Sequence, residues 1–339
     1  MYNFIIIGYN SDMYFRSYGD IFGLNNVQYV PENVNSKISP TCLFTKNNRL
    51  INLLHKIHHS TKINKYFNFP FKNLWFKYYF KPKFNKNSKI IFLLFGRQLH
   101  LFNAGYIDYL KNEYPNSKFV CFFQDLIKTH VDVNISEIKK KFDMVISFDQ
   151  KDANQFEIDY FPLVNSRTKF SLNSDFEESD VYFLGYAKDR LSDIVLAYEE
   201  LKKIGLKCSF YVVNAKKEEI KYKDEINYIN GMSYEDNLKH IQKTKCILEL
   251  MQKGGVGYTQ RMMEAIIYNK LIVTNNESVK VAEFYNTSNI LQIQNIRDIG
   301  TNEGFFNNID RTVDHKYRDK ISPINLLNTI VNKLEKGKK

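Results

Sequence analysis

The sequence predicts an α/β protein of two domains, each built on a parallel sheet. Short apolar runs of strand length alternate with helix-period patterns along the chain. The 339 residues, 44% hydrophobic and 25% charged, suffice for two soluble domains with a core each. A polar, strand-poor stretch, residues 165–180, separates the halves. We therefore expect an N-terminal domain, residues 1–170, and a C-terminal domain, residues 171–339, facing each other across a cleft.

The N-terminal half combines buried strands with amphipathic helices. Its apolar runs predict strands at Phe4–Ile7, Ile90–Phe95, Lys118–Phe123 and Met144–Phe148. Its helical patterns are Arg49–His59, Leu101–Asn112 and Ile135–Lys141. The alternation of the two patterns is typical of parallel α/β units.

The C-terminal half repeats the alternation more regularly. Expected strands are Val181–Leu184, Ser209–Val213, Ile226–Ile229, Lys245–Leu250 and Leu271–Thr274. Expected helices are Leu191–Ile204, Tyr234–Gln242 and Thr259–Tyr268. The last helix, Pro323–Leu334, is expected to pack back on a domain, with the N-terminal domain as a candidate.

The segment Glu249–Asn276 is the most informative part of the chain. It passes from an apolar strand through the glycines Gly254, Gly255 and Gly257 into a helix, and returns as a strand. Such a βαβ unit can hold an anion, because glycines let backbone amides approach phosphate oxygens. Thr259 can cap the helix, whose free N–H groups favour negative charge. A plain tight connection is the alternative interpretation.

Two charged residues on the following helix strengthen the anion interpretation. Arg261 and Glu264 are three residues apart, so they share a helical face. An arginine can clamp a diphosphate, and a glutamate can accept hydrogen bonds from ribose hydroxyls. The P-loop pattern and the G-x-G-x-x-G dinucleotide pattern are both absent from the sequence. The segment therefore predicts a nucleotide-sugar site of another kind.

Three segments in order carry a resemblance to a known family. They are VYFLGYAKDRLSDIVLAYEELKKIGLKCSFYVV from Val181, INYINGMSYEDNLKHIQKTKCILELMQ from Ile226 and GGVGYTQRMMEAIIYNKLIVTNN from Gly254. Together they resemble GT-B glycosyltransferases, particularly the bacterial enzymes of capsular polysaccharide and lipopolysaccharide biosynthesis. The resemblance covers about half the chain and implies two Rossmann-like domains. The first half fits by fold, except for FDQKDANQF (Phe148–Phe156), which resembles an element near the domain junction.

The resemblance implies a donor-binding set. Glu264 would bind the ribose, Arg261 and the glycine loop would face the diphosphate, and the turn before Tyr234 would read the nucleobase. The whole set is Glu264, Arg261, Gly254, Gly255, Gly257, Thr259, Tyr186, Lys188, Arg190, Met232, Ser233 and Glu249. Two alternatives stay open. Lys188 and Arg190 would be solvated loop charges, or Ser233 and Asp236 would form a capping box without a ligand.

The sequence departs from the family at one position. Many retaining GT-B enzymes place a glutamate eight residues before the ribose-binding one, and this chain has Val256 there. The retaining mechanism is therefore not carried over. The sequence contains no Asp-x-Asp, which favours a metal-independent site without a cofactor, with the nucleoside diphosphate sugar as co-substrate.

An inverting transfer needs a base for the acceptor hydroxyl. Asp125, directly after a predicted strand, is the leading candidate, with His130 and His100 behind it. A helix N-cap is the alternative role for Asp125. His55, His58 and His59 form a histidine cluster, but no carboxylate is near them in sequence. A solvated or phosphate-facing helix is therefore favoured over a metal site.

The charge of the chain is concentrated in one segment. Residues 33–107 contain no Asp or Glu but thirteen of the 48 Lys and Arg residues, and the whole chain has a net charge of +11. Within residues 56–89 the lysines alternate with aromatic residues, which suits an anionic membrane surface. A solvated basic face is the alternative. No nucleic-acid partner is expected, because no recognition motif accompanies the charge.

These patterns predict a cytoplasmic glycosyltransferase, peripheral on the inner face of the cell membrane. It would move a sugar, with a hexose from a UDP-sugar favoured, to a surface-polysaccharide or lipid-linked saccharide acceptor. The start of the chain has no basic region of a signal peptide, and the four cysteines are far apart. The alternatives are a catalytically silent GT-B module that binds glycan or a partner enzyme, and a transferase for another group such as a glycerol phosphate polymer.

Overall fold

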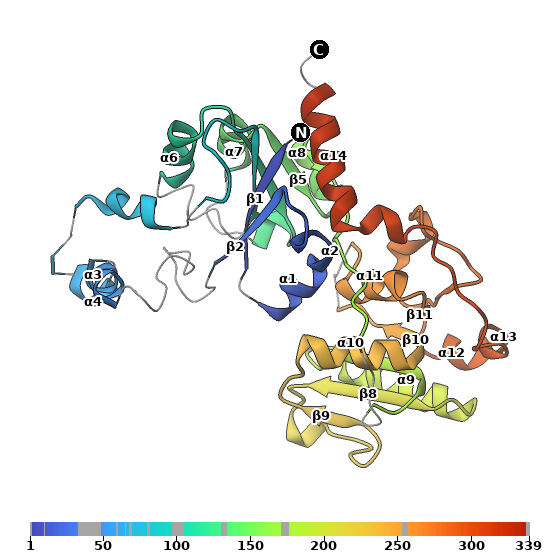
Figure 1. Ribbon diagram of the computed structural model, residues 1–339. Coiled ribbons are helices and arrows are strands. Elements are labelled where there is room, and N and C mark those ends of the chain that lie inside the picture. Colours follow the sequence, from blue (N-terminus) through green and yellow to red (C-terminus); the bar gives the residue numbers. More distant parts are fainter. Residues whose placement is uncertain are drawn as a thin grey trace. The chain divides into compact units, whose positions relative to one another are not determined.

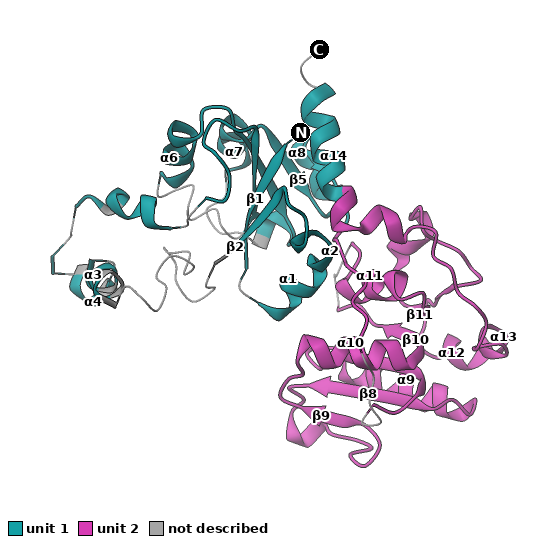
Figure 2. Ribbon diagram, in the orientation of Figure 1, with its two compact units in different colours: residues 1–162, 326–339 teal, residues 163–325 magenta. Residues whose placement is uncertain are grey.

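The computed structural model describes residues 2–9, 11–32, 49–58, 60–64, 66–67, 70–79, 82–96, 105–129, 134–170, 176–252 and 257–336. The chain divides into two compact units, which are coloured separately in Figure 2. Unit 1 comprises residues 1–162 and 326–339, and unit 2 comprises residues 163–325. Each unit is described by itself. No helix within the described ranges is long and apolar enough to cross a membrane.

Unit 1 is built on a six-stranded sheet in which every neighbouring pair is parallel (Figure 1). The strand order is β2-β1-β3-β4-β5-β6. The strands are β1 (Asn3–Tyr9), β2 (Val27–Glu32), β3 (Ile90–Phe95), β4 (Lys118–Phe123), β5 (Met144–Ser147) and β6 (Asp159–Tyr160). All six residues of β3 are buried, as expected of a central parallel strand covered on both faces.

The helices of unit 1 are short, except for the last one. They are α1 (Asp12–Ser17), α2 (Gly19–Phe22), α3 (Arg49–His58), α4 (Thr61–Asn64), η1 (Lys72–Tyr78), α6 (Tyr106–Glu113), η3 (Ile127–Thr129), α7 (Ile135–Lys141), α8 (Gln150–Phe156) and α14 (Pro323–Lys336). From Leu326 onwards α14 belongs to unit 1. Lys333 pairs with Asp159 of β6, which holds α14 at that edge of the sheet.

Unit 2 contains a second six-stranded parallel sheet, in the order β12-β11-β10-β7-β8-β9. Its strands are β7 (Ser179–Tyr186), β8 (Cys208–Val213), β9 (Asn227–Ile229), β10 (Thr244–Glu249), β11 (Leu271–Thr274) and β12 (Ile290–Gln292). Its helices are α9 (Leu191–Lys203), η4 (Lys217–Glu219), α10 (Tyr234–Lys243), α11 (Gln260–Ile267), η5 (Glu277–Val281), α12 (Asp298–Thr301), α13 (Glu303–Phe306) and η6 (Arg318–Ile321).

Alternating side chains of β7 define the two faces of this second sheet. Val181 and Phe183 pack into a core with α9, whereas Tyr182 packs into a second core with α10 and α11. The period of two along the strand is what separates the faces. Helices therefore cover both faces of the sheet, as parallel sheets require.

The predicted fold class is confirmed: two α/β domains with parallel sheets. Each strand expected in the sequence is present, and β10, α11 and β11 form the expected βαβ unit with adjacent parallel strands. The sequence missed the edge strands β2, β6 and β12. The β2 strand mixes polar residues with Pro31, which only an edge position tolerates. Of the helix expected at Leu101–Asn112, residues 101–104 lie outside the described ranges, and α6 begins after Gly105, whose φ is 79°.

The division between the units falls at residue 162 rather than at the expected residue 170. Two backbone connections tie the intervening stretch to unit 2. The amide of Asn165 donates to the carbonyl of Ile321 at 2.9 Å. The amide of Thr168 donates to the Tyr268 hydroxyl at 3.1 Å, and the carbonyl of Thr168 accepts from that hydroxyl at 2.9 Å. The polar composition of residues 165–180 gave no indication of these hydrogen bonds to unit 2.

Candidate functional site

The candidate site lies in unit 2, where the strands β7, β10 and β11 end side by side. Glu249 is the last residue of β10 and is fully buried. Its Oε2 accepts a hydrogen bond from the Thr274 hydroxyl at the end of β11, at 2.6 Å, and its Oε1 accepts one from the Thr259 hydroxyl. Burial raises the pKa of Glu249, while the two threonine hydroxyls oppose that rise. Glu249 thus ties two strand ends to the start of α11.

Thr259 is the N-cap of α11, as the sequence predicted. Its side chain accepts a hydrogen bond from the amide of Met262 at 3.4 Å. Gly257, two residues before it, has φ at 80°, a conformation that favours glycine. The Gly257 carbonyl accepts a hydrogen bond from Asn276 Nδ2 at 2.8 Å. Gly254 and Gly255 lie outside the described residues.

Two arginines converge at the end of β7. The guanidinium carbons of Arg190 and Arg261 lie 5.9 and 5.7 Å from the centre of the Phe183 ring. Arg190 Nε donates to the Tyr186 carbonyl at 3.1 Å and Nη1 to the Leu250 carbonyl. Arg261 Nε donates to the Leu184 carbonyl. Strand-end carbonyls therefore fix both guanidinium groups in place.

Because Gly185 has no side chain, the two guanidinium groups can approach each other beside its Cα. A Cβ at this position would lie 2.9 Å from Arg190 Nη2 and 3.1 Å from Arg261 Nη2. Both nitrogens therefore point at the same glycine, and any larger residue would push at least one of them away. The absence of a side chain at Gly185 is part of the construction of the site.

The two guanidiniums form a positively charged pair. Burial, and then the neighbouring Arg261, lower the pKa of Arg190 to about 10. The carboxylates of Asp189 and Glu249 oppose this lowering of the Arg190 pKa, and the charge of Arg261 acts on Glu249 and Glu264. Two adjacent like charges gain most from a bound anion that neutralises both. The solvated interpretation of Arg190 was wrong, because this residue is 5% exposed.

Glu264 occupies the buried face of α11. It is 2% exposed, and burial raises its pKa to about 7 against the opposing charge of Arg261. Glu264 Oε1 accepts a hydrogen bond from Asn237 Nδ2 at 3.4 Å, and Asn237 Oδ1 accepts one from the Tyr182 hydroxyl at 3.1 Å. A carboxyl group in such a setting is held by neutral polar partners, and further hydroxyl donors would stabilise its charged form.

The turn expected to read a nucleobase has a capping role. Ser233 is the N-cap of α10: its hydroxyl accepts from the amide of Asp236 at 3.0 Å and donates to Asp236 Oδ2 at 2.7 Å. Ser233 therefore forms the cap expected in that alternative, and its role in binding the nucleobase stays a prediction. Met232 Sδ lies 3.5 Å from the Tyr182 hydroxyl, next to the partners of Glu264.

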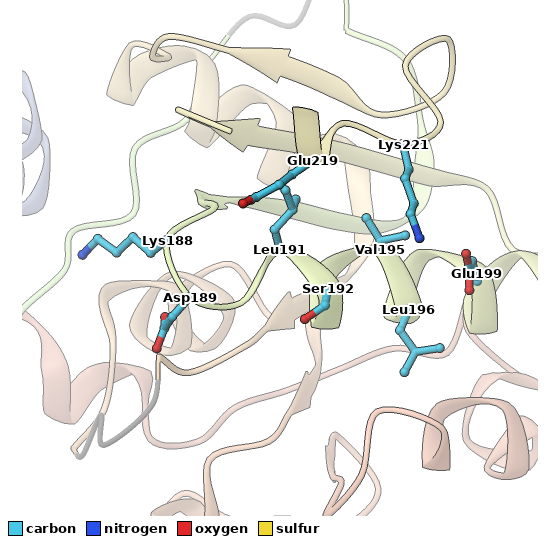
Figure 3. Close-up of a pocket in the computed structure, with 9 residues that line it drawn as sticks. All are labelled: Lys188, Asp189, Leu191, Ser192, Val195, Leu196, Glu199, Glu219 and Lys221. Atoms are coloured by element: carbon cyan, nitrogen blue, oxygen red, sulfur yellow. The ribbon is translucent and has the colours of Figure 1, made fainter. Parts of the chain in front are cut away.

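Lys188 and Tyr186 are exposed, unlike Arg190, Glu249 and Glu264 of the predicted set. Lys188 Nζ donates to Gln252 Oε1 at 3.2 Å and lies 5.8 Å from the Tyr186 ring centre. Lys188 also borders a hollow of about 600 Å³ against α9, where its side chain extends away from the other labelled residues (Figure 3). The hollow is lined by both lysines and carboxylates, so its charge selects no ligand.

The predicted base candidates lie in unit 1. Asp125 follows β4 and is half-buried. Its loop is anchored by Asp152, whose Oδ2 accepts from the amide of Ile127 at 2.8 Å. This contact gives the FDQKDANQF segment a structural role, and Asp149 of the same segment caps α8. His130 and His100 lie outside the described residues.

A group of aromatic rings lies at the same edge of unit 1. The Tyr14 ring centre lies 4.5 Å from that of Tyr9, 5.5 Å from that of Phe95 and 6.4 Å from that of Tyr18. Gln124 Nε2 donates to the Tyr18 hydroxyl. Burial raises the pKa of Tyr18 well above its usual value, so the Tyr18 hydroxyl stays neutral at ordinary pH.

The solvated interpretation of the histidine cluster was wrong for His55. Its ring is buried and lies edge-on to Trp75, with centroids 5.1 Å apart. His58 Nδ1 accepts a hydrogen bond from Trp75 Nε1 at 2.6 Å. His59 lies outside the described residues. No group of three potential metal ligands occurs in the part of the chain that the structure describes.

Comparisons with known proteins place the fold. No protein-family model matches the chain, and no curated protein matches it in sequence. An α-glucosyltransferase structure with UDP-glucose and DNA containing an abasic site matches over 99% of both chains, with a TM-score of 0.55 and 9% identity. Sucrose-phosphate synthase from Thermosynechococcus elongatus matches over 99% of this chain and 100% of its own, with a TM-score of 0.50 and 10% identity.

A third similar structure carries a different activity in its name. A protein assigned as UDP-N-acetylglucosamine 2-epimerase from Listeria monocytogenes matches over 99% of this chain and 97% of its own, with a TM-score of 0.51 and 8% identity. The chain therefore has the GT-B fold, two Rossmann-like α/β domains, which also carries chemistry other than glycosyl transfer.

One expectation about partners needs correction. The sequence gave no recognition motif for nucleic acid, and none was expected as a partner. The α-glucosyltransferase of the same fold has DNA in its structure, which is at odds with excluding nucleic acid.

Proposed function

We propose that the chain is a glycosyltransferase that takes a sugar from a nucleoside diphosphate donor, with a UDP-sugar and a hexose favoured. The pair Arg190 and Arg261 carries the proposal. Two fixed guanidiniums beside Gly185, at the carboxyl ends of parallel strands, suit the two phosphates of such a donor. Two of the three similar folds are named for reactions of UDP-glucose or of a UDP-sugar, which supports this donor class.

The arginines would act on the leaving group. Breaking the bond between sugar and phosphate leaves negative charge on the diphosphate, and fixed donors stabilise charge that develops there. The N-terminus of α11 and Lys188 would add to the same field. We propose that these groups replace a metal ion. Glu264 would accept hydrogen bonds from the ribose hydroxyls of the donor.

The acceptor step belongs to unit 1 in this proposal. We assign Asp125 as the base that removes the proton of the acceptor hydroxyl in an inverting transfer. His130 and His100 are the substitutes if Asp125 is dispensable. A retaining transfer would leave the proton to the donor phosphate, and a measurement of the product anomer decides between the two.

We propose a surface-polysaccharide or lipid-linked saccharide as the acceptor, with the protein peripheral on the cytoplasmic face of an anionic membrane. Residues 56–89 would make that contact. Tyr66, Phe67 and Phe71 in this range are exposed, which is unusual for large aromatic side chains. Lysines alternate with them along the sequence.

A two-stage donor experiment tests the proposal. UDP-, GDP-, CMP- and dTDP-sugars are first screened by thermal shift, in which a ligand at a hundred times its Kd stabilises by about 2.7 kcal/mol. The sugar nucleotide that binds is then incubated with the protein, and the products are identified by mass spectrometry and NMR. Transfer or slow hydrolysis supports the proposal. An epimerised sugar nucleotide would assign the other reaction of this fold, and binding without turnover would indicate a silent module.

A further inference from the structure

The helix α3 presents its apolar side outward. Leu50, Leu53, Leu54 and Ile57 follow the spacing i, i+3, i+4, i+7, so they form one stripe along the helix. All four are between 39% and 68% exposed. A helix that packs on its own domain normally buries such a stripe. In α3 these four side chains are exposed instead.

The opposite side of α3 is fixed by its histidines. His55 lies edge-on to Trp75 of η1, with ring centroids 5.1 Å apart, and also contacts Tyr79 at 6.2 Å between centroids. His58 accepts from Trp75 Nε1 at 2.6 Å, and its Nε2 lies 3.0 Å from the Pro70 carbonyl. Tyr79 in turn packs against Tyr106 of α6, at 5.2 Å between centroids.

These contacts connect α3 to the core of unit 1 through polar aromatic rings. Tyr79 and Tyr106 belong to that core and are almost completely buried. Turning α3 by half a revolution would bury the leucines, but it would also break the hydrogen bond between His58 and Trp75. The contacts of α3 with Trp75 therefore fix the orientation in which its leucines face outward.

The apolar surface continues past α3. Tyr66, Phe67, Phe71, Leu74 and Tyr78 are each between 37% and 79% exposed. With the four residues of α3 they form what we call the α3 face. Nine of the fifteen large hydrophobic side chains that are exposed among the described residues belong to this face. Exposed apolar residues gathered in this way mark an interaction surface.

The positive charge around the α3 face favours a negatively charged partner. Residues 33–107, which contain the whole face, have thirteen Lys and Arg residues and no Asp or Glu. A second copy of the chain would bring the same positive charge to the contact and be repelled. A bilayer with anionic lipids offers both an apolar interior and a negative surface.

We infer that the α3 face docks the protein on an anionic lipid bilayer, with the leucine stripe of α3 inserted at the boundary between headgroups and acyl chains. The inference deepens the proposed function, on which it rests for the location of the acceptor. It adds Leu50, Leu53 and Leu54, which precede residues 56–89 and belong to a helix that the sequence predicted to be solvated or phosphate-facing. The aromatic residues that follow would lie at headgroup level, and the lysines would contact lipid phosphates.

Vesicle sedimentation of the full chain tests the inference. The variant replaces three residues of the stripe with glutamine, Leu50→Gln, Leu53→Gln and Leu54→Gln, which keeps helix propensity and leaves the lysines in place. Vesicles of phosphatidylcholine with phosphatidylglycerol are compared with vesicles of phosphatidylcholine alone. We expect the parent to partition onto the anionic vesicles, and the variant to bind them at least about tenfold more weakly. Higher salt should weaken binding further.

Two controls separate docking from folding. Val281 and Ile324 are also exposed apolar residues, but they belong to unit 2, so Val281→Gln with Ile324→Gln should leave vesicle binding unchanged. Trp75 is the single tryptophan of the chain and contacts both histidines of α3. An unchanged Trp75 emission spectrum in the triple variant shows that α3 has stayed in place.

The outcomes also separate this inference from the proposed function. Equal vesicle binding by the parent and the triple variant would overturn the role of the stripe. A parent that binds UDP but neither type of vesicle would overturn docking and leave the donor site intact. A dimer of the parent, without vesicle binding, that the triple variant abolishes would assign the face to a second copy and overturn the lipid inference.

Discussion

The two sheets end in opposite kinds of chemistry. In unit 2 charged groups line the carboxyl ends of the strands: the buried Arg190 and Glu249, and, on α11, the half-buried Arg261 and the buried Glu264. In unit 1 the corresponding edge carries the rings of Tyr9, Tyr14, Tyr18 and Phe95 with the amide of Gln124. The same α/β topology therefore supports one strongly charged edge and one edge of mainly aromatic rings, to which Asp125 adds a single carboxylate after β4.

Under the proposed function, this difference would let each of the two similar domains bind a different substrate. Fixed guanidiniums suit phosphates, whose charge they neutralise, and they favour no particular sugar. Tyrosine rings and amides suit neutral, hydroxyl-rich molecules, because rings cover their apolar faces and amides pair with their hydroxyls. Under the proposed function, unit 2 would hold the donor by its charge and unit 1 would hold the acceptor by its shape.

The largest expected effect is the loss of transfer activity when Asp125, the carboxylate at the aromatic edge of unit 1, is replaced. Asp125→Asn keeps the size of the side chain but removes its ability to take a proton. We expect transfer to fall by about 10²–10⁴ while UDP binding stays unchanged. Steady-state kinetics with the donor and acceptor, beside a UDP titration, measure both. Full activity in this variant would make Asp125 a structural residue.

The second largest expected effect is a lower rate of transfer when an arginine at the charged edge of unit 2 is replaced. Arg261→Ala should lower the rate of transfer by about 10²–10³, because one fixed donor to the leaving diphosphate is lost. Arg311→Ala is a matched control: Arg311 also donates to backbone carbonyls and stacks on a phenylalanine, 4.7 Å from the Phe305 ring centre. We expect the control to lower stability but to keep the UDP response. Equal losses in both variants would mean that the arginines of β7 and α11 are structural.

Glu264 offers a test through pH. Its folded pKa of about 7 exceeds the ordinary value of 4.5, so the folded state holds a proton that the unfolded state releases between these values. The parent should therefore lose stability as pH rises through this window, and Glu264→Gln should not. We expect the difference between their unfolding free energies to change by roughly 2 kcal/mol between about pH 5 and pH 8. Urea denaturation at both pH values measures it, and a constant difference would contradict the burial of an uncharged Glu264.

The smallest expected effects are those of removing the two helix N-caps of unit 2, Ser233 and Thr259. Ser233→Ala and Thr259→Ala should each lower stability by about 1 kcal/mol, since each removes an N-cap. Thr259→Ala should also weaken UDP binding, because Glu249 then loses a hydroxyl donor next to the arginines. Ser233→Ala should not. A loss of UDP binding in the Ser233 variant would restore the nucleobase role first expected for this turn.

The sequence predicted what local patterns determine. Apolar runs gave the central strands of both sheets, and Gly257, Thr259, Arg261 and Glu264 were found from their spacing around one loop and helix. These features need only nearby residues. The fold class followed from their alternation along the chain.

The sequence missed what distant residues determine. Arg190 stands beside Lys188 and Asp189 and resembled a solvated charge, but its partner is the Leu250 carbonyl, sixty residues away. The side on which α3 packs depends on Trp75, well outside that helix. Pairings of this kind come from the tertiary fold, and no local periodicity reports them.

The central claim is that the guanidinium pair of unit 2 binds the diphosphate of a sugar nucleotide. Calorimetric titration of uridine, UMP and UDP into the parent, Arg190→Ala and Arg261→Ala tests it directly. The account predicts that each phosphate strengthens binding to the parent, with UDP at least about a hundredfold tighter than uridine, and that most of this gain disappears in either variant. If the gain per phosphate is the same in all three proteins, the phosphates bind elsewhere and the claim is wrong.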